Sequence, residues 1–176
     1  MKSLKPLWLT GPVFLAGLSA APAQASGLTV TVEIPRLGVS EYHRPYVAMW
    51  IEGGGLARPL DLAVWYDVKM ADNGGTKWLS DMRLWWRKSG RNLQMPVDGV
   101  SGATKAPGTH TVNFTEGRKP LASLPAGQYE FVIEAARELG GREFLRIPFQ
   151  WPPKGGESLS AKGGSELGAI KLNLKK

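Results

Sequence analysis

The chain has 176 residues, of which 43% are hydrophobic and 21% are charged, a length and balance typical of one globular domain rather than of a disordered segment. It contains no cysteine, which excludes disulfides, thiolate metal centres and thiol catalysis, and two histidines offer at most a sparse metal site. The 22 lysine and arginine residues outnumber the 15 acidic residues but form no block of five, so we expect no nucleic-acid binding.

The first 25 residues predict an export signal. Lys2 and Lys5 precede an apolar run over residues 7–18, and Ala23-Gln24-Ala25 has the small–x–small pattern that signal peptidase recognises. The apolar run is shorter than the roughly 20 residues that a transmembrane helix requires. We therefore expect cleavage after Ala25 and a periplasmic protein without a membrane span. Its residues 26–176 would form a single domain, with a formal net charge lowered from +7 to +5.

Hydrophobic and polar residues alternate through most of the remaining chain, which is typical of β-strands. Breaks that contain glycine or proline separate these alternating runs. About seven short antiparallel strands of this kind predict an all-β fold, an immunoglobulin-like antiparallel β-sandwich. The expected strands are residues 28–34, 46–51, 62–70, 110–114, 129–135, 145–149 and 170–174.

Two segments depart from this alternation. Residues 77–88 carry apolar side chains at the spacing of one helix face, which predicts one short amphipathic helix packed against the sandwich. Residues 152–168 are rich in proline, glycine, lysine and serine and have little to bury, so we expect a long loop before the last strand. The residues with helical spacing are Trp78, Met82, Trp85 and Trp86.

The segment Asp98-Gly99-Val100-Ser101-Gly102-Ala103-Thr104 is the most informative part of the sequence for function. Its composition predicts a loop in which two hydroxyls lie beside residues with almost no side chain, so another molecule could approach the backbone closely. The segment resembles the flavinylation motif of exported proteins, Asp-x-x-(Ser/Thr)-Gly-Ala-(Ser/Thr), at every fixed position. The resemblance implies that an ApbE-type flavin transferase takes FMN from FAD and joins it through its phosphate to the hydroxyl of Thr104, with Ser101 the weaker candidate acceptor.

Short motifs surround this segment in a characteristic order, at residues 42–52, 77–79, 84–87, 107–108, 127–129 and 134–143. Their order is similar to that of a periplasmic domain-of-unknown-function family commonly encoded beside PepSY-type membrane reductases. The similarity covers residues 30–149 and implies a covalently flavinylated electron carrier that exchanges electrons with such a reductase. The segment 152–168 lies outside it.

The tether would keep the flavin ring near Thr104, so the ring must find its contacts on nearby surface. Aromatic side chains could stack on the ring, and an arginine beside it would stabilise the negative charge of the reduced form. The residues expected to contact the cofactor are Asp98, Ser101, Gly102 and Ala103 within the motif, and His43, Arg44, Trp85 and Trp86 outside it.

Two other functions fit the sequence. An unmodified immunoglobulin-like module would bind a protein partner, and its Asp/Ser/Gly segment would be an ordinary turn. A reductase would use the tethered flavin on a small acceptor such as a ferric complex. The sequence identifies no catalytic residue and no metal ligand, and we expect FMN to be the cofactor.

Overall fold

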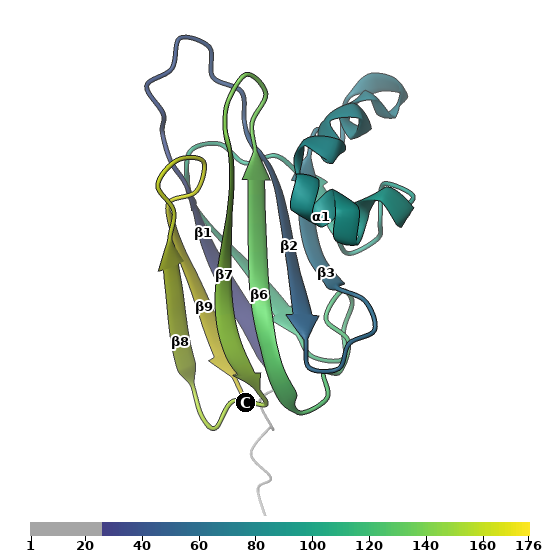
Figure 1. Ribbon diagram of the computed structural model, residues 1–176, viewed down its shortest axis with the longest axis vertical. Coiled ribbons are helices and arrows are strands. Elements are labelled where there is room, and N and C mark those ends of the chain that lie inside the picture. Colours follow the sequence, from purple (N-terminus) through teal and green to yellow (C-terminus); the bar gives the residue numbers. More distant parts are fainter. Residues whose placement is uncertain (1–25) are drawn as a thin grey trace, which may run out of the picture.

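The computed structural model describes residues 26–176, and the predicted export signal lies outside the described residues. The strands form two facing sheets, and a helical segment covers part of the outer face of one of them (Figure 1). The predicted all-β sandwich with a short helix is confirmed. No helix within residues 26–176 is long and apolar enough to cross a membrane.

The first sheet has four antiparallel strands in the order β5-β1-β9-β8. Its side chains alternate as the sequence predicts, since Leu28, Val30 and Val32 are buried against the other sheet while their neighbours face outward. The predicted loop over residues 152–168 is wrong in part, because this segment contains the edge strand β8. The bounds are β1 (Gly27–Ile34), β5 (Gly108–Thr115), β8 (Glu157–Lys162) and β9 (Ala169–Lys175).

The second sheet has five strands in the order β4-β3-β2-β6-β7. The central strand β2 is buried on both faces, as its continuous apolar sequence predicts. The predicted extension of the third strand to Met70 is wrong, because β3 ends at Tyr66 and both Val68 and Met70 are exposed. The bounds are β2 (Tyr46–Gly53), β3 (Leu60–Tyr66), β4 (Ser101–Ala103), β6 (Gly127–Ala136) and β7 (Arg142–Trp151).

Two helical elements replace the single helix predicted over residues 77–88. A 3₁₀ segment η1 (Ala71–Asp81) is followed by the α-helix α1 (Arg83–Lys88), and a third short turn is η2 (Gly90–Asn92). The helical conformation is interrupted at Met82, where ψ is 71° rather than helical. The apolar spacing was informative even so, because Leu79, Met82 and Trp85 are buried against the outer face of the five-stranded sheet and form a second core with it.

A fully buried carboxylate fixes α1 on the sheet. Glu134 of β6 accepts the backbone N–H groups of Leu84 at 3.1 Å and Trp85 at 2.7 Å, and it pairs with Arg142 at 2.7 Å. The N–H groups in the first turn of a helix have no partners inside the helix. Glu134 therefore caps α1 from the neighbouring strand, and the negative charge suits the positive end of the helix.

A second carboxylate, that of Asp61 in β3, also holds α1 against the sheet. The indole N–H of Trp85 donates to Asp61 at 2.7 Å, and the hydroxyl of Ser89 donates to the same carboxylate. Burial raises the pKa of Asp61, and these two hydrogen bonds lower it by less. A carboxyl whose pKa is raised by folding binds its proton more tightly in the folded state, so its contribution to stability declines as the pH rises through that pKa.

We therefore expect Asp61→Asn to gain stability relative to the wild type as the pH rises from about 3 to about 7, because the amide keeps the hydrogen-bonding shape without the buried charge. Urea unfolding of both proteins at several pH values measures the difference. The exposed Glu157→Gln is the control and should show no such trend. A constant difference across the pH range would contradict the prediction.

Candidate functional site

The segment 98–104 lies along the edge of the five-stranded sheet. Its last residues form β4, which pairs in parallel with β3, with Gly102 beside Trp65. The backbone N–H of Thr104 donates to the carbonyl of Tyr66 at 3.2 Å. The prediction of an entirely irregular loop is therefore wrong at residues 101–103. This pairing fixes Thr104 where β3 ends.

Two residues of the motif have roles in the fold. A Cβ on Gly102 would lie 3.2 Å from Cδ1 of Trp65, so the absence of a side chain lets the segment lie directly on the indole ring. The hydroxyl of Ser101 accepts the backbone N–H of Val97 at 2.8 Å and closes the turn before β4. This hydroxyl therefore has a role in the local fold, and its rank as the weaker candidate acceptor stays a prediction.

The other two fixed residues have little contact with the fold. The Asp98 side chain is 91% exposed and lies 3.8 Å from the exposed Lys119, and Ala103 is exposed. An ion pair this exposed contributes little to stability. These two positions are therefore open to another molecule, whereas the hydroxyl of Ser101 and the backbone at Gly102 serve the local structure.

Thr104 lines a cavity of about 560 Å³ at the end of the sandwich where the β1–β2 connection and the β6–β7 turn lie close together (Figure 1). Ligand pockets have volumes of about 300–1,000 Å³, so this cavity is large enough for a small molecule. The fold brings the predicted His43 and Arg44 to the same cavity as Thr104. The remaining lining residues are Tyr42, Tyr46, Asp67, Met70, Trp78, Asp81, Ala136 and Glu138.

Hydrogen bonds hold the walls of this cavity in place. The hydroxyl of Tyr46 donates to the carbonyl of Gly75 at 2.9 Å and joins β2 to η1. His43 lies between two carboxylates, with Nε2 at 3.0 Å from Glu41 and Nδ1 at 3.5 Å from Glu138. The histidine therefore links the β1–β2 connection to the β6–β7 turn across the cavity.

A buried ion pair lies behind the same wall. Arg137 binds Glu166 through two hydrogen bonds of 2.9 and 3.1 Å, and its guanidinium carbon lies 6.0 Å from the ring of Tyr42. Burial raises the pKa of Tyr42 above its ordinary value of 10.0. The guanidinium group of the pair lies beside the ring that forms part of the cavity wall.

Carboxylates outnumber cationic side chains in the cavity. Asp67, Asp81 and Glu138 line it together with Arg44 and His43. The lining is therefore negative overall at neutral pH. A neutral aromatic molecule suits such a cavity better than a highly charged anion does, apart from the vicinity of Arg44.

The structure does not bring Trp85 or Trp86 to this cavity. Trp85 is fully buried between α1 and the sheet, where its N–H is bonded to Asp61, and Trp86 lines a separate cavity between α1 and the start of β7. The aromatic side chains beside Thr104 are those of Tyr42, Tyr46 and Trp78. The sequence grouped Trp78 with the other two tryptophans as one helix face, but the break at Met82 places it in a different segment.

Comparison with known proteins identifies one family. The model of a family described as predicted periplasmic protein, DUF2271, matches residues 27–169, a range that includes strands β1 to β8, the helical segment and every residue of the Thr104 cavity. No curated protein and no solved structure matches the chain. The family description confirms the periplasmic localisation that the sequence predicts. The chain therefore belongs to the DUF2271 family of predicted periplasmic proteins.

Proposed function

We propose that this protein is a periplasmic electron-transfer protein that carries FMN attached through a phosphoester to Thr104. The position of Thr104 is the observation that carries the proposal. The residue that would be modified ends the strand pairing with β3 and lines a cavity with three aromatic side chains, so a group attached to it has a preformed space beside it. The proposed modifying enzyme is an ApbE-type flavin transferase that uses FAD.

The residues of the cavity fit a flavin ring in size and chemistry. Its volume lies within the range of cofactor pockets, and Trp78 and Tyr42 offer faces on which a flat ring stacks. FMN, when bound, supplies the transfer of one or two electrons. Arg44 offers a positive charge to the phosphate or to the polar edge of the ring, while the carboxylates oppose any negative charge there.

Exposed apolar side chains gather at the same end of the molecule. Val39 lies in the β1–β2 connection, Met70 precedes η1, and Leu139, which is 79% exposed, lies in the β6–β7 turn. Of these three, Met70 lines the Thr104 cavity. Single exposed apolar residues are ordinary, but several at one end of a molecule are typical of a surface that another protein covers. This supports a carrier that meets a partner at the flavin, and we propose a PepSY-type membrane reductase as that partner.

Intact mass tests the proposed function. The protein, exported in cells that co-express an ApbE-type flavin transferase, should gain the mass of one FMN moiety and stay yellow after denaturation. Protein from matched cells without the transferase should lack the added mass. An unchanged mass in both preparations would overturn the proposed function in favour of an unmodified binding module.

The charges of the cavity predict opposite effects on the reduction potential of the attached flavin. Arg44→Ala should lower the potential and Glu138→Gln should raise it, because a positive charge favours the reduced ring and a negative charge opposes it. A change of about 1.4 kcal/mol corresponds to about 30 mV for a two-electron couple, and we expect shifts of about that size. Spectroelectrochemical titration measures them. Equal potentials in both variants would place the ring outside the cavity.

Flavin emission tests which tryptophan contacts the ring. Trp78→Ala should brighten the emission, because stacking on an indole quenches flavin fluorescence, and the flavin should stay attached. Trp86→Ala is the matched control, since Trp86 lines the other cavity, and it should leave the emission unchanged. Brighter emission in the Trp86 variant alone would contradict this placement of the ring.

A further inference from the structure

Another cavity, distinct from that of Thr104, lies between α1 and the start of β7. It has a volume of about 340 Å³ and is lined by Ser80, Arg83, Trp86, Arg87 and Arg142. Three of these five side chains are arginines, one is an indole, and none is a carboxylate. The volume is within the range of small-molecule pockets. The lining is thus strongly positive, in contrast to the acidic lining beside Thr104.

The helix places three of these side chains together. Arg83, Trp86 and Arg87 occupy positions i, i+3 and i+4, which share one face of a helix. The Nε of Arg87 donates to the carbonyl of Arg83 at 3.2 Å, which restrains the guanidinium group. Trp86 is half-buried on the second core, with its ring 6.2 Å from that of the buried Trp85. Two cationic groups and a fixed aromatic ring therefore border one space.

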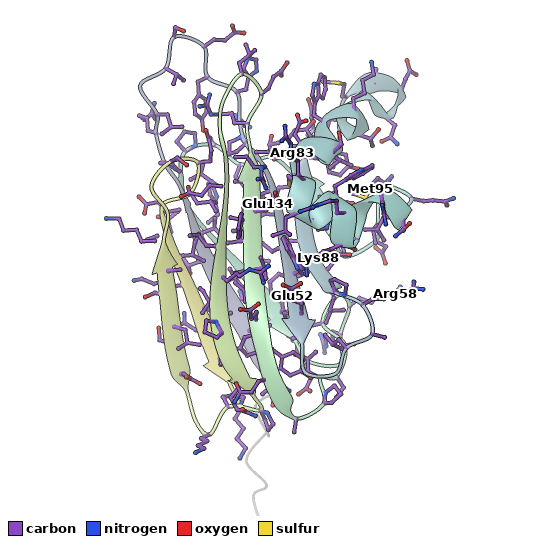
Figure 2. All side chains as sticks on the ribbon, viewed as in Figure 1. Glu52, Arg58, Arg83, Lys88, Met95 and Glu134 are labelled. Carbon is purple, nitrogen blue, oxygen red and sulfur yellow. The ribbon has the colours of Figure 1, made fainter. Side chains whose placement is uncertain are left out.

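Of the three arginines in this cavity, Arg142 is paired with a carboxylate, and Arg83 also lines an adjoining cavity with Asp81 and Glu138. Glu134, which is labelled in Figure 2, is fully buried and already binds Arg142 and the two N–H groups of α1. Within residues 26–176, neither Arg83 nor Arg87 forms an ion pair with a carboxylate, whereas Lys88, the next residue of α1, pairs with Glu52 at 2.6 Å. The two free guanidinium groups stay available to a ligand.

We propose that this cavity is a binding site for a small planar anion, an aromatic ring that carries carboxylate or phosphate groups. The ring stacks on Trp86, and the acidic groups bind Arg83 and Arg87, whose planar guanidinium groups match carboxylate and phosphate oxygens. Arg142 adds positive charge at the edge, although it remains bound to Glu134. The site does not depend on modification of Thr104, because no residue lines both cavities.

Calorimetric titration with benzene-1,3,5-tricarboxylate tests the proposal, with flavin-free wild-type protein. Arg83→Gln combined with Arg87→Gln should weaken binding at least about tenfold, because hydrogen bonds to charged groups contribute more than neutral ones do. The matched control combines Arg58→Gln with Arg91→Gln, which removes the same charge elsewhere and should change the affinity less than about twofold. Equal losses of affinity in the two double variants would mean that the basic protein attracts the anion without a specific site, and would overturn the proposed site.

Comparison of a flat with a non-flat tricarboxylate tests whether the ligand ring stacks on Trp86. Cyclohexane-1,3,5-tricarboxylate presents the same charges without a flat ring, so it should bind several-fold more weakly than the benzene compound. Trp86→Leu should remove this preference, and the double arginine variant provides an independent test if the leucine variant does not fold. Equal binding of the two compounds to the wild type would overturn the preference for a planar ligand, and absence of binding by both would overturn the site.

Discussion

Thr104→Ala should abolish the attachment of FMN completely. The proposed bond joins the flavin phosphate to the side-chain hydroxyl, and alanine has no oxygen with which to form it. Intact mass after export with the flavin transferase measures the result, and the expected mass is that of the unmodified chain. Thr104→Ser should retain part of the modification, because serine offers the same nucleophile without the methyl group.

Ser101→Ala is the informative control for this experiment. Its hydroxyl accepts a hydrogen bond from the backbone N–H of Val97 in the turn before β4, and we expect Thr104 rather than Ser101 to be modified. Loss of one such bond costs about 1 kcal/mol of stability, which should leave most of the protein folded and modified. Full modification of the Thr104→Ala protein, or loss of modification only in the Ser101→Ala protein, would show that Thr104 is not the acceptor.

Glu134→Ala should produce the largest loss of stability among the single substitutions that we consider. The change leaves the N–H groups of Leu84 and Trp85 without their buried acceptor and Arg142 without its partner. Removal of one member of a buried charged pair typically costs about 3–5 kcal/mol. We expect about 3 kcal/mol here, since the Arg142 side chain is partly exposed and regains water. Urea unfolding measures the free-energy difference.

Glu130→Ala provides the comparison on the same strand. Glu130 pairs with Arg146 at 2.6 Å, but its side chain is 44% exposed, so its loss should cost less than about 1 kcal/mol. The second core contains several tryptophans, and near-ultraviolet circular dichroism should therefore change in the Glu134 variant and not in the Glu130 variant. Equal stability losses in the two variants would contradict the capping role of Glu134.

The strands with an apolar face could be predicted from the sequence, because period-two alternation reflects burial on one side of a sheet. Residues 157–162 give only a weak signal of this kind, in which Leu159 and Ala161 alternate with polar residues. They form an edge strand whose other side chains are exposed, so its pairing with β9 depends largely on backbone hydrogen bonds that composition does not reveal. The break at Met82 was equally hidden, because the tertiary contact with Glu134 determines where α1 begins.

The candidate site was only partly predictable, for a similar reason. A local motif identifies Thr104, and their charge and chemistry indicate His43 and Arg44. The fold brings these three residues to one cavity. Glu138 and Trp78 come from segments far away in the sequence, and no local pattern connects them to Thr104. Trp85 was a reasonable candidate by residue type, but its burial depends on packing against a strand more than 20 residues earlier.

The pairing of β4 with β3 also bears on how the protein avoids association with itself. An unpaired strand edge is a template on which other chains add strands, and proteins limit this risk with short or covered edges. β4 pairs with the last three residues of the seven-residue β3, and its own outer edge is only three residues long. Deletion of the Asp98–Thr104 segment would remove β4 and leave the edge of β3 unpaired. We therefore expect the deletion to favour aggregation, in addition to removing the proposed acceptor threonine.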